Sequence, residues 1–282
     1  TIRQRLLDRH LDRPLFVDPD PALGFNPPNN YIPTWRAECY AFSSFAYEGV
    51  YIGFPMMYYP TGQSLPGRAN TDGFDIIQLA VSRDLKTWKR VGDRKAFIGP
   101  STNEHGLVGV FDRMQLSAPG CPITVGDELW FYYSGFKTRI PMYSLNPDGT
   151  KRDAQTLTKE ERNDLEDGWA AICLAVLRRD GFVSLDAKQS AGVLLTHPLK
   201  ITGETLWVNM NAVQGSAKIE LMTESGEPIP GFSGEHMALV KGDGVRLPVV
   251  FASGQKLDAL GSSTVRLRVE LSQASLYAFW TE

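Results

Sequence analysis

The sequence has few residues that bind metals or form disulfides, and it has no long apolar run. Its 282 residues include four histidines and three cysteines, Cys39, Cys121 and Cys173, and both residue types are widely spaced. This spacing excludes a disulfide framework and a zinc knuckle, so we interpret the cysteines as small buried side chains. No apolar run approaches the ~20 residues of a membrane-spanning helix. The first ten residues are charged, unlike a signal peptide, and the compartment stays open.

The charge pattern and the motif search exclude further classes of function. The net charge is −3 and no block of five or six like charges occurs, so we expect neither a nucleic acid nor a membrane as partner. The sequence lacks H-E-x-x-H, C-x-x-C, G-x-G-x-x-G, the Walker loop and G-x-S-x-G. We therefore predict no metal site and no organic cofactor, and leave open only a divalent ion in a central funnel.

Strand signals dominate the sequence, which predicts an all-β fold. Helical periodicity is confined to 156–167, a charged stretch inside an apolar-poor insertion at 140–168. Short aromatic and β-branched runs are bounded by glycine, proline, aspartate and asparagine, and they read ECYAFSSFAY, GVYIGFPMMYY, DIIQLAVS, MQLSAPG, ELWFYYSGF and AAICLAVL.

The sequence IIQLAVSRDLKTWKRVG at 76–92 has a partner in ICLAVLRRDGFVSLDA at 172–187. Each follows an aromatic strand with a Tyr-Tyr pair, so the chain contains a repeat. Four strands are expected per repeat, the last carrying Trp88 or Phe182. Four antiparallel strands make one blade of a β-propeller. We therefore predict a partial propeller over 1–188, of about two blades and a remnant strand at RPLFVDPD.

From Gly192 the sequence alternates apolar and polar residues with a period of two, which predicts a C-terminal β-sandwich over 189–282. Two blades cannot close a propeller, which needs about four to eight. They would also leave unpaired sheet edges. We therefore expect another chain, or a missing N-terminal segment, to complete the ring. A small self-contained β domain is the alternative.

Two carboxylates begin matching strands of the repeats and are our catalytic candidates. Glu38 lies in TWRAECYAF and Asp112 in GVFDRMQLSAP. Two carboxyl groups facing one pocket are what glycoside cleavage uses, one as the acid and the other as the nucleophile or base. The expected partner is therefore a carbohydrate. Side chains that could stack on its rings or bind its hydroxyls are Trp35, Arg36, Tyr40, Tyr58, Asp75, Glu104, His105 and Arg113.

The segment DIIQLAVSRDLKTWKRVG resembles a blade segment shared by glycoside hydrolase families 32 and 43, which are five-bladed propellers; family 32 adds a C-terminal sandwich. WRAEC resembles the Glu-Cys element of family 32, which implies that Glu38 is the general acid/base. FDRMQLSAP is similar to the element of the next blade, which implies that Asp112 contacts substrate. The order of these segments resembles the C-terminal half of a bacterial family 32-like group. The early blades, which carry the nucleophile, would then lie outside this sequence.

The leading hypothesis is therefore a glycoside hydrolase whose site is completed by blades outside the chain. One alternative is a non-catalytic glycan-binding or assembly module. Another is a polysaccharide lyase on a similar propeller, with His105 or Tyr40 as the base. The sequence determines neither the sugar nor the linkage nor the stereochemical outcome.

Overall fold

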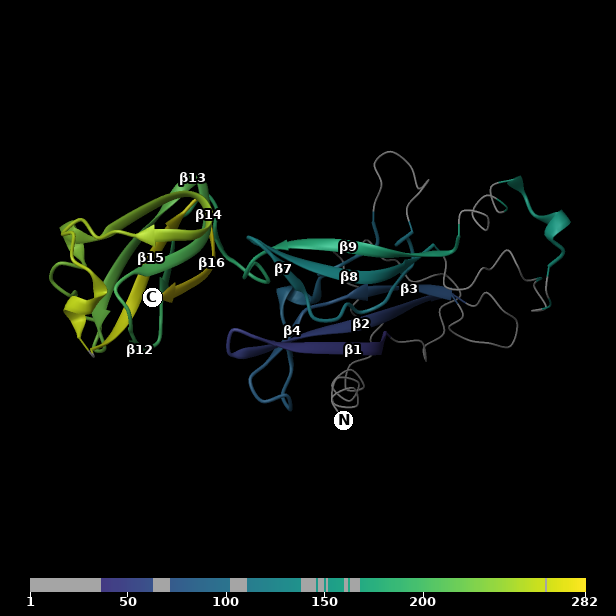
Figure 1. Ribbon diagram of the computed structural model, residues 1–282, viewed down its shortest axis with the longest axis horizontal. Coiled ribbons are helices and arrows are strands. Elements are labelled where there is room, and N and C mark those ends of the chain that lie inside the picture. The colour runs from purple at the N-terminus through teal and green to yellow at the C-terminus, as the bar shows by residue number, and fades with distance from the viewer. Residues whose placement is uncertain are drawn as a thin grey trace. The chain divides into compact units, whose positions relative to one another are not determined.

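A computed structural model of the chain describes residues 37–62, 72–101, 111–137, 146, 150, 152–159, 162, 168–261 and 263–282 (Figure 1). Strands dominate these residues, so the all-β prediction is confirmed. Short 3-10 helices occur at Gly92–Arg94, Ala154–Thr156, Gly234–His236 and Leu257–Leu260. In the predicted helix at 156–167, the Arg162 N–H donates to the Thr158 carbonyl at 3.0 Å, an α-helical bond. No helix within the described ranges has the length and apolarity to cross a membrane.

The first sheet contains the strands predicted for the first repeat. Its central strand β2 pairs with β1 along one edge and with β3 and β4 along the other. β3 and β4 act as one interrupted strand, and β5 pairs with β4 to complete an antiparallel meander. The strands are β1 (Glu38–Tyr47), β2 (Val50–Gly62), β3 (Asp72–Ile77), β4 (Ala80–Ser82) and β5 (Lys89–Arg90).

Local chemistry explains how the first sheet turns and closes. Glu48 and Gly49 both have positive φ, as a two-residue hairpin between β1 and β2 requires. Trp88 is buried and packs edge-to-face on Phe42, with ring centroids 4.7 Å apart. The indole ring of Trp88 also lies against Gly53. A Cβ at position 53 would lie 2.5 Å from this ring, so only glycine fits there. The bulky residue of the first repeat thus covers its own sheet.

The second sheet differs from the prediction at its outer edge. Its strands are β6 (Gln115–Leu116), β7 (Ile123–Val125), β8 (Glu128–Phe136) and β9 (Ala170–Arg178). β6 and β7 pair with one edge of β8, and β9 pairs with the other. The predicted fourth strand around Phe182 is wrong, because the chain turns there and the next strand, β10 (Leu185–Ala187), pairs with β16 in a different sheet.

Aromatic rings fill the space between the first two sheets. Phe131 of β8 lies edge-on to Phe54 of β2, with centroids 5.4 Å apart, and also contacts Phe97 at 6.1 Å. A backbone hydrogen bond from the Asp75 N–H to the Met114 carbonyl, 2.9 Å long, joins the sheets directly. Sheet packing of this kind removes large apolar area from water and is the main stabilising term here.

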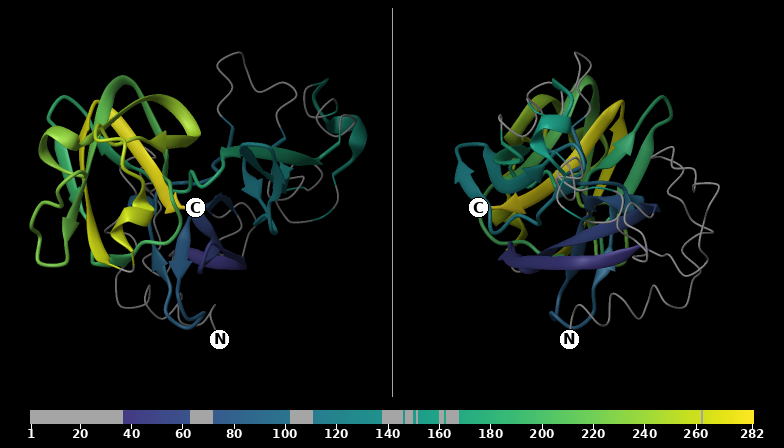
Figure 2. Two further views of the ribbon diagram at one scale, coloured as in Figure 1. Left: turned by 60° about the vertical axis from the view of Figure 1, so that its left-hand side comes forward. Right: turned by 90° about the vertical axis from the view of Figure 1, so that its right-hand side faces the viewer.

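The third sheet has seven strands, and they curve around a common interior (Figure 1 and Figure 2). Its 18-residue strand β13 pairs with β14 on one side and with β15 and β16 in turn on the other. Alternate residues of β13 from Leu206 to Met210, and of β15 from Val265 to Leu271, are buried in its core, as the period-two pattern predicts. Besides β10 the strands are β11 (Gly192–Leu195), β12 (Leu199–Lys200), β13 (Leu206–Thr223), β14 (Ala238–Val249), β15 (Thr264–Ser272) and β16 (Ala274–Thr281).

The described residues form two compact units. The first contains those up to 123 together with 129–176, and the second contains 124–128 and 177–282. The predicted division into 1–188 and 189–282 stays a prediction, and so does the arrangement as propeller and sandwich.

Candidate functional site

Three candidate residues from three strands fall in one cross-strand row. Glu38 lies opposite Tyr58 in the β1–β2 register, and Tyr58 lies opposite Asp75 in the β2–β3 register. Residues directly opposite one another in an antiparallel pair lie about 4.5–5.5 Å apart. The fold therefore places two acidic residues on either side of a tyrosine, although 20 and 17 residues separate them along the chain.

The two tyrosines at this row differ in accessibility. Tyr58 is 1% exposed, and its ring lies so close to Gly73 that a Cβ there would be 2.5 Å from the hydroxyl. Tyr40 is 37% exposed and meets Tyr58 edge-on, with ring centroids 5.0 Å apart. Of these two predicted sugar-stacking rings, only Tyr40 presents surface to a ligand.

Asp75 lies beneath the surface at the junction of the first two sheets. Its side chain is fully buried, so the structure gives it no surface for direct contact with a ligand. Its N–H donates to the carbonyl of Met114, two residues beyond Asp112. Asp75 therefore links the first two sheets through its backbone and has no direct access to a ligand.

Asp112 is held by two hydroxyl groups. Its side chain is 5% exposed, and its Oδ2 accepts hydrogen bonds from the Tyr133 hydroxyl at 2.6 Å and from the Ser101 hydroxyl at 2.8 Å. No donor within the described ranges reaches its other oxygen, Oδ1. One oxygen is thus fixed by the protein while the other keeps its capacity to accept a hydrogen bond.

Asp112 does not match the position of Glu38 as the repeat predicted. Glu38 is the first residue of β1, whereas Asp112 lies three residues before β6. The bend at 113 and 114 turns the chain there, and half-buried Arg113 lies within it. Because of the bend, Asp112 approaches β8 across Gly135, where a Cβ would lie 2.7 Å from that of Asp112.

The sequence did not identify Tyr133 and Cys173, two neighbours of Asp112, as candidate site residues. Burial raises the pKa of Tyr133, and its hydrogen bond to the Asp112 carboxylate raises it further, so the hydroxyl stays a donor. Burial also raises the pKa of the Cys173 thiol, and the negative charge of Asp112 adds to this shift. The available signal for Tyr133 was the Tyr-Tyr pair that each repeat contains.

Several predicted residues lie outside the described part of the chain. Trp35, Arg36, Glu104 and His105 belong to this group, and of Glu38 only the backbone is described. No group of three or more metal-ligating side chains occurs among the described residues. The roles proposed for these residues, and the divalent ion left open, stay predictions.

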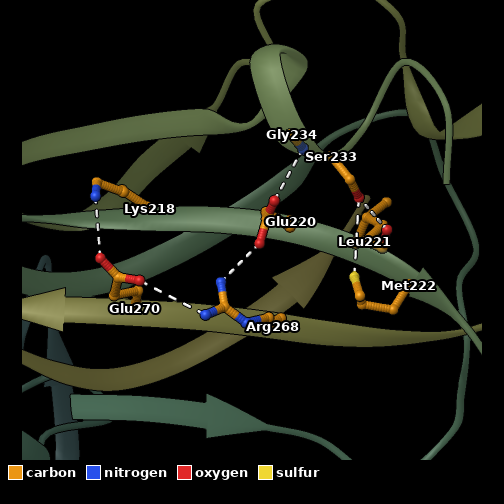
Figure 3. Close-up of polar contacts among 8 residues, drawn as sticks. All are labelled: Lys218, Glu220, Leu221, Met222, Ser233, Gly234, Arg268 and Glu270. Carbon is orange, nitrogen blue, oxygen red and sulfur yellow. Dashed lines mark hydrogen bonds and ion pairs between the residues drawn. The ribbon is translucent and has the colours of Figure 1, made fainter. Parts of the chain in front are cut away.

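The outer surface of the third sheet carries a charged row with no aromatic partner in it. Lys218 pairs with Glu270 at 3.0 Å, Glu270 with Arg268 at 3.6 Å, and Arg268 with Glu220 at 2.7 Å (Figure 3). Glu220 also accepts the N–H of Gly234. Opposite charges on neighbouring strands stabilise a sheet modestly. We interpret this row as the solvated face of the sheet.

No protein-family model matches the chain, and no curated protein matches it. Among solved structures, it is similar to a glycoside hydrolase family 43 arabinoxylan arabinofuranohydrolase from Bacillus subtilis, in complex with cellotetraose. The alignment has 9% identity and a TM-score of 0.22, and covers 86% of this chain and 53% of that protein. A likeness of this size assigns neither fold nor function to the chain.

Proposed function

We propose that the chain is carbohydrate-active and contributes part of a glycosidase site, in which Glu38 is the general acid/base. The observation that supports this is the row of Glu38, Tyr58 and Asp75 across β1, β2 and β3. Two inter-strand spacings separate the acidic residues, which is about 10 Å between Cα atoms.

In this proposal the three acidic residues have different tasks. Position 38 donates the proton to the leaving oxygen, because it begins a strand at the edge of the row. Buried Asp75 supports the end of the row, where its N–H binds the Met114 carbonyl, without touching the sugar. Asp112 positions a sugar hydroxyl with Oδ1, since Tyr133 and Ser101 hold Oδ2.

The remaining parts of the proposal concern the sugar and the architecture. Tyr40 stacks on a sugar face, because its ring is the accessible one at the row. The first two sheets are blades of a propeller and the third is a sandwich-like module. The nucleophile comes from a blade outside this sequence.

The test is turnover by the chain purified from the cells that make it, with whatever polypeptide accompanies it. A panel of 4-nitrophenyl glycosides, soluble arabinoxylan and levan supplies the substrates. Glu38→Gln removes the acidic proton at nearly constant size, so turnover should fall about 10²–10⁴-fold. Glu48→Gln is the matched control, since Glu48 lies exposed in the hairpin at the other end of β1.

Equal turnover by Glu38→Gln and the parent protein would refute the catalytic role. Absence of turnover by the parent, together with glycan binding that survives Glu38→Gln, would identify a binding module instead.

A further inference from the structure

One face of the second sheet is apolar and open to solvent. Along β9 the side chains of Ile172, Leu174 and Val176 are 72%, 41% and 51% exposed. Tyr132 of β8, 47% exposed, shares this face, because Tyr133 and Cys173 point to the other one. The segment 170–177 contains no charged residue. We call Tyr132, Ile172, Leu174 and Val176 the open face.

The opposite face of the same sheet is already covered. Leu129, Phe131 and Tyr133 are buried there, and Phe131 packs on Phe54 of the first sheet. Strands that are apolar on both sides are typical of a sheet covered on both faces. A contiguous apolar surface on a folded protein marks an interaction site. We therefore expect the open face to be covered by another layer of structure when the protein functions.

The edge of β9 points to the same conclusion. β9 pairs with β8 on one side, and no strand of the described residues pairs with it on the other. An apolar edge strand without proline or lysine is the kind that natural proteins cover. The sequence AAICLAVL has neither residue.

Two long segments that lie mostly outside the described residues hold few runs that could form a covering sheet. The segment 138–167 is rich in charged and polar residues, and 1–36 contains one strand-like run, RPLFVDPD. Several alternating apolar runs are needed for a sheet. The outer row of the third sheet is charged, which suits water rather than the open face (Figure 3).

We infer that the open face is the docking surface for a β-sheet of another polypeptide, one whose inner face is apolar and aromatic. The structure supplies the precedent, because the first sheet covers the reverse side through phenylalanine rings. A flat face of alternating apolar residues fits a second sheet about 10 Å away. This inference concerns assembly and does not depend on the role of Glu38.

Photo-cross-linking in the cells that make the protein tests the inference. A benzophenone amino acid replaces Leu174, and mass spectrometry maps the cross-linked peptide. We expect the peptide to come from a strand-forming segment of another polypeptide. The yield should fall about tenfold in a Val176→Lys background, because a charge would be buried without a partner.

Val213→Lys is the matched control, since Val213 is 63% exposed on the third sheet and should leave the yield unchanged. A cross-link to a second copy of the chain, or to its own C-terminal unit, overturns the inference. So does a yield no greater than that of the benzophenone placed at position 213. Glycosidase assays of the same variants report separately on Glu38.

Discussion

The two sequence repeats share a motif, Leu-Ala-Val followed by Arg-Asp, but the chain takes a different route after each one. In the first repeat, Asp84 accepts the N–H groups of Lys86 and Thr87 at 2.8 and 2.7 Å, and the chain returns as β5. In the second, Arg178 binds Asn209 at 2.6 Å and pairs with Asp243, and the chain continues into the third sheet.

This difference shows which part of a repeated motif determines structure. The apolar residues form a strand in both cases, because alternation and burial act locally. The route after the strand depends on what the polar residues bind. A turn closed by its own carboxylate keeps the chain in its sheet, whereas an arginine with partners on another sheet directs it away. The following predictions test this comparison.

The largest effect on stability is expected for Trp88 and Phe182, the bulky residues that follow the two repeated motifs. Trp88→Ala should lower the free energy of unfolding by about 3–5 kcal/mol, because Trp88 is buried against its own sheet. Phe182→Ala should cost less than about 2 kcal/mol, because Phe182 is partly exposed in a turn. Urea unfolding of both variants measures the difference. Equal costs would show that Phe182 is packed in the same way as Trp88.

The next largest effect is expected for Asn209, which holds the arginines of the second repeated motif. Fully buried Asn209 accepts a hydrogen bond from Arg178, and its amide donates to the Arg179 carbonyl at 2.6 Å. Asn209→Ala leaves both groups unsatisfied and should lower the unfolding free energy by about 2–3 kcal/mol. Exposed Asn211, two residues along β13, is the control, and Asn211→Ala should change it by less than about 1 kcal/mol. Similar values for the two variants would contradict this role of Asn209.

A smaller effect is expected for the influence of Asp112 on the reactivity of the Cys173 thiol. A raised pKa means that less Cys173 is thiolate at a given pH, and alkylation is correspondingly slow. Asp112→Asn removes the negative charge, so alkylation of Cys173 at about pH 8 should accelerate about two- to tenfold. Mass spectrometry of iodoacetamide adducts gives the rates. Cys121, which is exposed and not buried as the sequence predicted, should react at the same rate in both proteins. An unchanged Cys173 rate would show that burial alone controls the thiol.

The smallest effect is expected at the turn of the first motif. Hydrogen bonds from the Thr87 and Lys86 N–H groups lower the pKa of Asp84 from 3.8 to about 2. A lowered pKa in the folded state stabilises the protein above the unfolded value, and this is lost as the pH falls through about 2. The stability difference between the parent and Asp84→Asn should therefore be constant near neutral pH and vanish in strong acid. A difference independent of pH would exclude the charge as its source.

The strands of the first unit could be predicted from the sequence because their signal is local. Aromatic and β-branched alternation predicted β1, β2 and β8 nearly to the residue. The sequence wrongly predicted an outer strand at Phe182. The route of the chain there depends on the contact of Arg178 with Asn209, which lies 27 residues beyond Phe182. A sequence repeat does not indicate a hydrogen-bond partner as distant as Asn209.

The candidate site shows the same limit. Glu38, Tyr58 and Asp75 were identified by residue type, but their alignment follows from two strand registers that the sequence leaves open. The bend before β6, which brings Asp112 to Tyr133, also has no local signal stronger than that of an ordinary loop. The candidate site is therefore defined by strand pairings and not by a sequence motif.

The pairing of β13 with β16 has a consequence for biosynthesis. The first six residues of β13 pair with residues between Ser275 and Thr281, some 70 residues later. During translation that third of β13 remains without this neighbour until β16 has left the ribosome. A ribosome stalled shortly before Ala274 would hold a nascent chain whose third sheet is incomplete, and chaperones that bind exposed strands should recognise it there.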